Sequence, residues 1–152
     1  MSSPIRKKRI LLVDRNVNWL EFAAETLAET GYSVQTLDQY DDSPNSAYFD
    51  KTQPDLVILG CAKIRQPEYC FIQEVRNAKR PLIVLGASLT WDERRFLFLK
   101  GVDVADKPFD ADGLAQVIEE AFDYPILEPE EKYMIKLSDK AFEQQTQPVL
   151  LT

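Results

Sequence analysis

The 152-residue sequence contains no histidine and only two cysteines. Histidine is the usual general base near neutral pH, so its absence excludes Ser-His and Cys-His nucleophile pairs and disfavours ordinary hydrolase chemistry. Cys61 and Cys70 lack the CxxC spacing of a metal or redox site. We therefore expect both cysteines to be packing residues in a reducing environment such as the cytosol.

Long apolar runs are also missing. No stretch approaches the ~20 apolar residues that cross a bilayer, and the N-terminus does not resemble a signal peptide, so we expect a cytoplasmic protein without a membrane partner. The 18 Lys and Arg residues are outnumbered by 25 Asp and Glu, and the net charge is −7. Nucleic acids are bound through clustered Lys and Arg. Nucleic acid is therefore not an expected partner, and the one basic run, residues 6–9, is interpreted as a solvated entry to a strand.

Short apolar runs alternate with amphipathic segments, which is typical of a parallel α/β sheet. The first run is continuous rather than alternating, as expected for a strand that helices cover on both faces. Five such strands are predicted, at residues 9–13, 32–37, 55–59, 81–85 and 102–106. Five strand–helix pairs in about 120 residues predict a doubly wound, five-stranded parallel sheet of the flavodoxin-like (βα)5 kind.

Capping signals mark the predicted helices. Gly31 is suited to end the first helix. Four helix starts are indicated by Asn16, by Ser43 with Pro44, by Thr90 with Glu93, and by Asp110. The predicted domain covers residues 1–124. Residues 125–152 form a charged, proline-punctuated extension that either docks on the domain or binds a partner, and the sequence leaves both alternatives open.

Several segments resemble landmarks of response regulator receiver domains. In that family the first strand is followed by two acidic residues and an Asn, the third strand ends in the phospho-accepting Asp, and the fourth strand carries a Thr or Ser near its end. The matching segments here are 10–16 (ILLVDRN), 54–60 (PDLVILG), 81–87 (PLIVLGA), 101–103 (GVD) and 107–109 (KPF). The resemblance covers residues 6–122 and implies the receiver fold of bacterial two-component signalling proteins.

The departures from the family pattern fall on its phosphorylation site. The family's three carboxylates hold the Mg²⁺ that phosphoryl transfer needs. Asp14 is retained, but Arg15 stands at the second acidic position and Gly60 at the acceptor position. A guanidinium does not ligate a metal and glycine offers no nucleophile. The resemblance therefore implies a degenerate pocket with no metal and no catalytic residue.

The switch positions of the family are changed as well. Gly86 stands in place of the Thr or Ser, and Val104 in place of the switch aromatic. Lys107 is retained, and its bond to Pro108 resembles the family's cis peptide. One hypothesis is that Asp14, Arg15 and Lys107 form a self-neutralised cluster, because a lone buried charge is costly. The alternative is that Arg15 simply points to solvent.

The predicted fourth helix carries an apolar run, residues 96–99, on four consecutive positions. Such a run points around more than half of a helix, so part of it has no place in the core. In receivers, the surface of the fourth helix, fifth strand and fifth helix is the usual interface for dimers and effectors. Trp91, Phe96 and Phe98 are therefore candidate contact residues, and a homodimer is one expected assembly. The alternative is that Tyr133 and Ile135 of the extension pack on this face.

These features predict a non-enzymatic regulatory module that acts through protein–protein interaction without phosphorylation. Two alternatives are a single-domain response regulator phosphorylated at a non-standard site and a small-molecule sensor. The sensor would use the pocket at the carboxyl edge of the sheet, with Cys61 at its rim. No Gly-rich phosphate loop follows the first strand, so a nucleotide is not the expected ligand.

Overall fold

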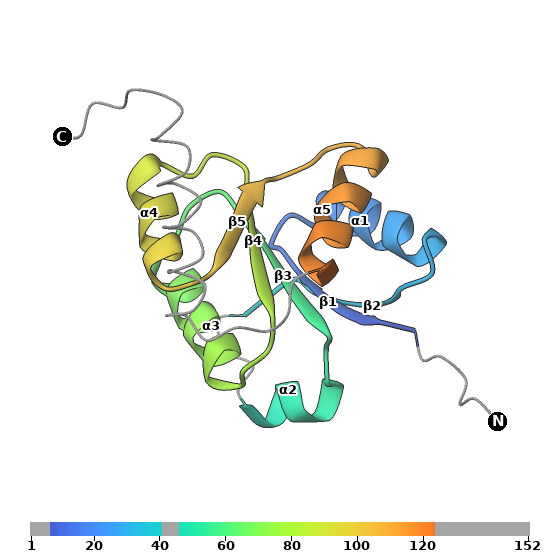
Figure 1. Ribbon diagram of the computed structural model, residues 1–152, viewed down its shortest axis with the longest axis horizontal. Helices are drawn as coiled ribbons and strands as arrows, with labels where there is room; N and C mark the ends of the chain where they lie inside the picture. The colour runs from blue at the N-terminus through green and yellow to red at the C-terminus, as the bar shows by residue number, and fades with distance from the viewer. Residues whose placement is uncertain (1–6, 41–45, 124–152) are drawn as a thin grey trace.

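The computed structural model describes residues 7–40 and 46–123. Within these ranges, five strands alternate with five helices along the chain (Figure 1). Their bounds are β1 Arg9–Val13, α1 Val17–Glu29, β2 Ser33–Leu37, α2 Ser46–Thr52, β3 Leu56–Cys61, α3 Gln66–Asn77, β4 Leu82–Gly86, α4 Trp91–Leu99, β5 Asp103–Asp106 and α5 Ala111–Asp123. No described helix is both long enough and apolar enough to traverse a bilayer.

The five strands form one parallel sheet in the order β2-β1-β3-β4-β5. The chain winds outward from β1 in one direction to β2 and in the other to β3, β4 and β5, which is the doubly wound topology that the sequence predicts. Helices α1 and α5 cover one face of the sheet, and α2, α3 and α4 cover the other (Figure 1). In such a fold the carboxyl ends of the strands meet at one edge, where ligands usually bind.

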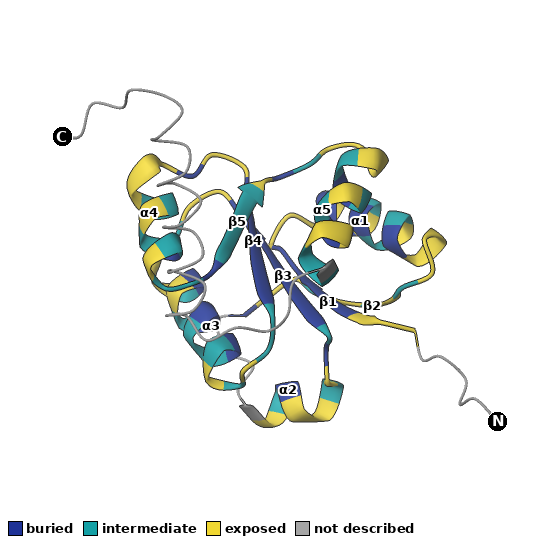
Figure 2. Ribbon diagram, in the orientation of Figure 1, coloured by how far each residue is buried: buried dark blue, intermediate teal, exposed yellow. Residues whose placement is uncertain are grey.

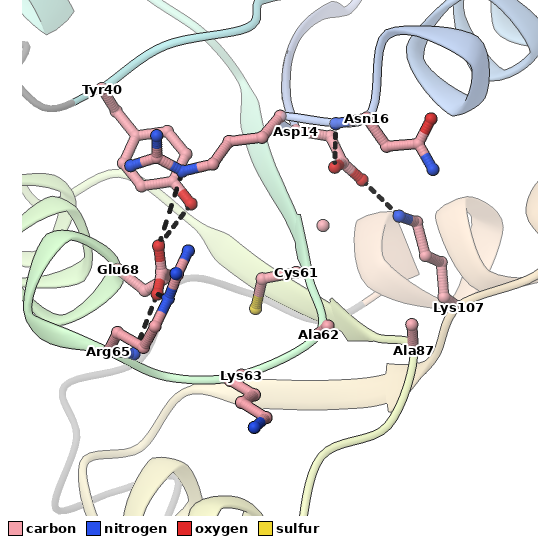
Figure 3. A pocket seen from close by; sticks show the side chains of 12 residues that line it. Asp14, Asn16, Tyr40, Cys61, Ala62, Lys63, Arg65, Glu68, Ala87 and Lys107 are labelled. Carbon is pink, nitrogen blue, oxygen red and sulfur yellow. Dashed lines mark hydrogen bonds and ion pairs between the residues drawn. The ribbon is translucent and has the colours of Figure 1, made fainter.

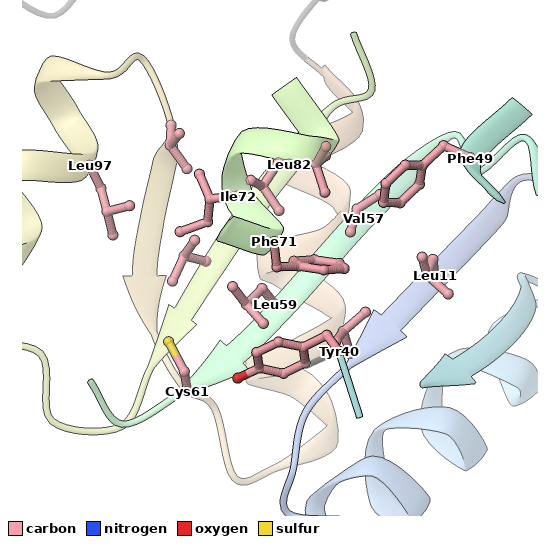
Figure 4. Packing of buried hydrophobic residues seen from close by; sticks show 14 of the residues in the cluster. Leu11, Tyr40, Phe49, Val57, Leu59, Cys61, Phe71, Ile72, Leu82 and Leu97 are labelled. Carbon is pink, nitrogen blue, oxygen red and sulfur yellow. The ribbon is translucent and has the colours of Figure 1, made fainter. Parts of the chain in front are cut away.

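Each face of the sheet has its own hydrophobic core. Successive strand side chains point to opposite faces, so Leu11 and Val13 of β1 join one core while Ile10 and Leu12 join the other. All residues of β3 and β4 are buried, as Figure 2 shows for the centre of the sheet. Phe71 of α3 lies against the larger core together with side chains from α2 and α4 (Figure 4). Burial on both faces explains why these strands read as continuous apolar runs.

The predicted helix caps are confirmed wherever the structure describes them. Asn16 accepts a hydrogen bond from the backbone N–H of Trp19, and Thr90 and Glu93 form a reciprocal capping box on α4. Asp110 accepts from the backbone N–H of Gly113 at 2.6 Å. Gly31, just beyond α1, has φ +100°, a conformation that glycine adopts without strain. The predicted helix start at residues 43–44 lies outside the described residues, as does the predicted extension 125–152.

The carboxyl ends of β3 and β4 differ from the predicted ones at two glycines, Gly60 and Gly86. β3 continues to Cys61 instead of ending at Leu59, because Gly60 and Cys61 pair in register with Leu85 and Gly86 of β4. Tertiary pairing therefore overrides the local preference of glycine for a loop. β4 likewise extends to Gly86, so both glycines of the predicted pocket lie at strand ends rather than in loops.

Candidate functional site

A hollow of about 490 Å³ lies at the carboxyl edge of the sheet, where β1 and β3 end beside the segment after β4 (Figure 3). Four of the six residues predicted for the degenerate pocket line it together, namely Asp14, Arg15, Gly60 and Lys107. Gly86 and Val104 do not line it, and the neighbouring Ala87 does. The hollow also includes charged residues that the sequence did not single out, namely Lys63, Arg65 and Glu68. Together with Asp14, Arg15 and Lys107 they make six described charged residues that line it.

Asp14 and Lys107 form a buried ion pair. The Asp14 side chain follows β1 and its Oδ2 lies 2.6 Å from Nζ of Lys107, with only 4% and 5% of the two side chains exposed. The other carboxylate oxygen of Asp14 accepts the backbone N–H of Asn16 at 2.8 Å. The Lys107 ammonium also lies 4.7 Å from the ring centroid of Trp19. The predicted pairing of Asp14 with Lys107 is confirmed, and each charge is compensated by the other.

Gly60 lies directly beneath the Asp14 carboxylate. A Cβ atom at position 60 would overlap Oδ2 of Asp14 and lie 3.0 Å from its Cγ. Real Cβ atoms do not approach other heavy atoms so closely, so a side chain at position 60 requires Asp14 to move. The Asp14–Lys107 pair therefore occupies the space in which an acceptor side chain would begin.

Arg15 does not join the Asp14–Lys107 pair, so this part of the predicted cluster is wrong. Its Nε lies 3.8 Å from Oε2 of Glu68, and its guanidinium carbon lies 4.3 Å from the ring centroid of Tyr40. Asp14 and Arg15 follow the end of β1 and contact different partners, Lys107 and Glu68. The alternative of a side chain directed simply to solvent is also wrong, because two-thirds of the Arg15 side chain is covered.

Glu68 is the central residue that sequence reasoning missed. It is fully buried at the start of α3, and its carboxylate accepts hydrogen bonds from the Tyr40 hydroxyl (2.6 Å), the Arg65 backbone N–H (2.8 Å) and Arg65 Nε (3.2 Å). Burial alone would raise the pKa of Glu68, but the hydrogen bonds from Tyr40 and Arg65 outweigh it and hold that pKa below its ordinary value. Burial and the bond to Glu68 raise the pKa of Tyr40. In sequence, Glu68 is indistinguishable from an ordinary acid in the first turn of a helix.

The residues of this hollow do not fit a magnesium site. Its two carboxylates, Asp14 and Glu68, are each neutralised by cationic side chains. Within residues 7–40 and 46–123, no group of three or more His, Cys, Asp or Glu side chains is placed to hold a metal ion.

The switch positions contain no polar side chain. A Cβ atom at position 86 would overlap the end of the Leu89 side chain and lie 3.3 Å from the Leu89 Cβ. The Leu89 side chain therefore fills the space that a Thr or Ser side chain would need. Val104 is half-buried on β5 and packs against the larger core. The Lys107–Pro108 bond is trans, because the described residues contain no cis peptide bond; the expected cis bond is wrong, and the trans form is the one that X-Pro bonds ordinarily prefer.

Cys61 lines the hollow and also belongs to the larger core (Figure 4). Burial, reinforced by the nearby carboxylates of Glu68 and Asp14, raises the pKa of its thiol to about 12. The group is therefore protonated at neutral pH and is a poor nucleophile. This agrees with the prediction that Cys61 is a packing residue.

The candidate contact residues on α4 are partly exposed, as the apolar run predicts. Trp91 is 68% exposed and Leu99 51%, whereas Leu97 is fully buried in the core. Phe96 and Phe98 are half-buried, and the Phe96 ring packs on Tyr69 of α3 at 5.7 Å. Tyr133 and Ile135 lie outside the described residues. Phe109, 73% exposed after β5, is an apolar surface residue that the prediction did not include.

No protein-family model and no curated protein matches the chain. Solved structures do match at the level of fold. A receiver domain protein (CheY-like) from Methanospirillum hungatei is 19% identical, with a TM-score of 0.62, over 78% of this chain and 95% of that one. The Vibrio cholerae chemotaxis protein CheY4 is 18% identical, with a TM-score of 0.61, over 76% and 99%.

A third similar structure is HP1043, an orphan response regulator of Helicobacter pylori. It is 20% identical and has a TM-score of 0.64, over 78% of this chain and 98% of that one. The matches agree with the five-stranded parallel sheet and its alternating helices. The chain therefore has the fold of a response regulator receiver domain.

Proposed function

We propose that this protein is a non-enzymatic regulatory module that acts through protein–protein contacts and is not controlled by phosphorylation. The observation that carries the proposal is Gly60 at the end of β3, with the Asp14 carboxylate occupying the space above it. No nucleophile stands at this position. Introducing one requires the Asp14 carboxylate to shift away from Lys107, and complete loss of the partner of a buried charge would cost about 3–5 kcal/mol.

The alternative function, phosphorylation at a non-standard residue of the pocket, has less support than the proposed one. Among the described residues, the carboxylates that line the hollow are Asp14 and Glu68, which are both buried and bound to cations. An acyl phosphate on either residue would first have to give up these ion pairs. Both carboxylates therefore have a structural role in this proposed module.

Magnesium binding provides a direct test of this part of the proposal. The Lys107 ammonium lies 4.7 Å from the Trp19 ring centroid, so we expect Trp19 fluorescence to report a change in the Asp14–Lys107 pair. A Trp91→Phe variant leaves Trp19 as the only tryptophan. We expect no saturable change on titrating Mg²⁺ into the low millimolar range at constant ionic strength. A saturable response would contradict the self-neutralised pocket.

The outer face of α4 is the proposed contact surface. Trp91 and Leu99 are exposed at the two ends of the helix, and Arg95 lies over the Trp91 ring at 5.5 Å. Figure 2 shows exposed residues along this helix. Exposed aromatic groups with a neighbouring arginine are enriched at protein-binding hot spots. This surface would bind either a second copy of the chain or a different protein.

The contact surface is tested by replacing its apolar groups with acids. Leu99→Asp on α4 is compared with Val17→Asp on α1, because both positions are exposed to about half and the charge change is the same. Sedimentation velocity over a range of concentrations measures self-association, and co-purification with a partner measures hetero-association. We expect only Leu99→Asp to abolish association. Equal behaviour of the two variants in an associating protein would place the interface elsewhere.

A further inference from the structure

The charge of the hollow is opposite in sign to that of the whole protein. Four cationic side chains, Arg15, Lys63, Arg65 and Lys107, line it with two carboxylates, Asp14 and Glu68. Among the described residues of the hollow, four positive and two negative charges leave an excess of two positive charges, whereas the full chain carries −7. A local surplus against the overall charge is the electrostatic signature of a site for an anion.

The cations and the carboxylates lie at different depths. Asp14 and Glu68 are at most 3% exposed, and each is turned toward its own partners. The Arg65 side chain is 64% exposed and that of Arg15 34%. Lys63 is exposed as well, and no described residue holds its ammonium in a hydrogen bond or ion pair. A ligand that enters the hollow therefore meets positive charge first, while the negative charge is already compensated below.

Glu93 is the acidic residue that interacts electrostatically with Lys63. Burial would raise the pKa of Glu93, but the hydrogen bonds from Ile64 and Thr90, together with the positive charge of Lys63, hold that pKa below its ordinary value. The Glu93 carboxylate accepts hydrogen bonds from the backbone N–H groups of Ile64 (2.5 Å) and Thr90 (2.9 Å). Lys63 therefore keeps its donors available for a ligand.

The centre of the hollow is lined by small residues. Gly60 has no side chain, and Ala62 and Ala87 have only a methyl group. Figure 3 shows Arg65 and Lys107 on opposite sides of the space beside Cys61, with Lys63 at its edge. Its volume of about 490 Å³ lies within the range of ligand pockets, roughly 300–1,000 Å³. The surplus of charge is thus combined with room for a compact group.

We propose that this hollow binds a phosphate or a phosphate monoester without forming a covalent bond to it. A phosphoryl group at neutral pH carries close to two negative charges and three acceptor oxygens, which match the surplus of two positive charges. Arg65 and Lys63 donate to these oxygens at the mouth, since guanidinium and ammonium groups are the usual phosphate partners. Arg15 and Lys107 contribute their charge from deeper in the hollow. The ligand arrives already phosphorylated, so no acceptor residue is needed.

The test uses the Trp91→Phe protein titrated with inorganic phosphate, with sodium chloride keeping the ionic strength constant. Trp19 fluorescence reports on the Lys107 side of the hollow, and isothermal titration calorimetry gives an independent dissociation constant. We expect saturable binding that chloride alone does not produce. No saturable signal by either method would overturn the proposal.

Charge-reversal variants locate the site. Lys63→Glu changes the mouth of the hollow, and Lys51→Glu makes the same change at an exposed lysine in the last turn of α2. Both side chains are exposed, so both proteins are expected to fold. We expect Lys63→Glu to weaken phosphate binding by about tenfold or more and Lys51→Glu to leave it within about twofold. Equal effects of the two changes would overturn the assignment of the ligand to this hollow.

The source of the phosphoryl group is distinguished by comparing inorganic phosphate with a phosphoserine peptide. The same Lys63→Glu sensitivity for both probes supports the proposal. Tighter binding of the peptide then identifies a partner protein's side chain as the source, and equal or weaker binding identifies a small phosphate compound. Binding of either probe that is indifferent to Lys63 contradicts the proposal.

Discussion

Replacing Gly60 with alanine is the sharpest test of how the pocket is built. The added Cβ overlaps Oδ2 of Asp14 and lies 3.0 Å from Cγ, so the carboxylate must turn away from Lys107. Overpacking a buried site costs roughly 1–3 kcal/mol. Partial loss of the ion pair adds a fraction of the ~3–5 kcal/mol that its complete loss would cost. The better propensity of alanine in a strand offsets about 0.5–1 kcal/mol.

These contributions together predict that Gly60→Ala lowers the free energy of unfolding by about 2–4 kcal/mol. For a chain of this size that corresponds to a fall in Tm of roughly 5–12 °C. Urea denaturation followed by circular dichroism measures the free energy, and a thermal scan measures Tm. Because the loss of stability comes from the overlap with the Asp14 carboxylate, we expect it to disappear when that carboxylate is removed.

A double-mutant cycle checks this dependence. In a background of Asp14→Ala with Lys107→Met, both charges are removed together, which is often close to neutral for a buried pair. We expect Gly60→Ala to cost less than about 1 kcal/mol in that background, because the overlapping group is gone. An equal cost in both backgrounds, or a negligible cost in the native protein, would refute the view that Asp14 fills the space above Gly60.

Three further predictions concern the groups around Glu68 and Cys61. Tyr40→Phe removes a hydrogen bond to a buried carboxylate and is expected to cost about 1–3 kcal/mol by urea denaturation, whereas Tyr69→Phe, at an exposed position, is expected to change little. Because the folded-state pKa of Glu68 is depressed, its contribution to stability is present above the unfolded value of about 4.3 and is lost as the pH falls through the lower folded value. Glu68→Gln should therefore flatten the decline in stability between roughly pH 5 and pH 3, while the exposed Glu29→Gln should not. Iodoacetamide at pH 7.5 should alkylate Cys61 far more slowly than the half-buried Cys70, as peptide mass spectrometry would measure, and comparable rates would contradict the burial of Cys61.

The fold was within reach of sequence reasoning because its signals are local and agree with one another. Continuous apolar runs predict strands covered on both faces, and the caps at Asn16, Thr90 and Asp110 fall where the helices begin. The ends of β3 and β4 were less predictable, since Gly60 and Gly86 favour loops locally and only the pairing between neighbouring strands keeps them extended. That pairing joins residues far apart in the sequence.

The candidate site was predictable in its members but only partly in its geometry. Asp14, Arg15, Gly60 and Lys107 line one hollow as expected, because each follows or ends a strand at the same edge of the sheet. The partner of Arg15 was not predictable. Glu68 comes from α3 and meets Tyr40 from the segment after β2, and neither residue carries a sequence signal of that contact. Such a network depends on packing between elements rather than on any local pattern.

We infer that the pocket has no acceptor for a phosphoryl group. The most direct test of this inference is the intact mass of the native chain after incubation with acetyl phosphate and Mg²⁺ at neutral pH, compared with a Gly60→Asp variant treated in parallel. We predict that the native chain keeps its unmodified mass, because glycine at the end of β3 supplies no nucleophile and both carboxylates of the hollow are bound in ion pairs. A stoichiometric phosphoryl adduct on Asp14, Glu68 or any other residue of the hollow would contradict the claim.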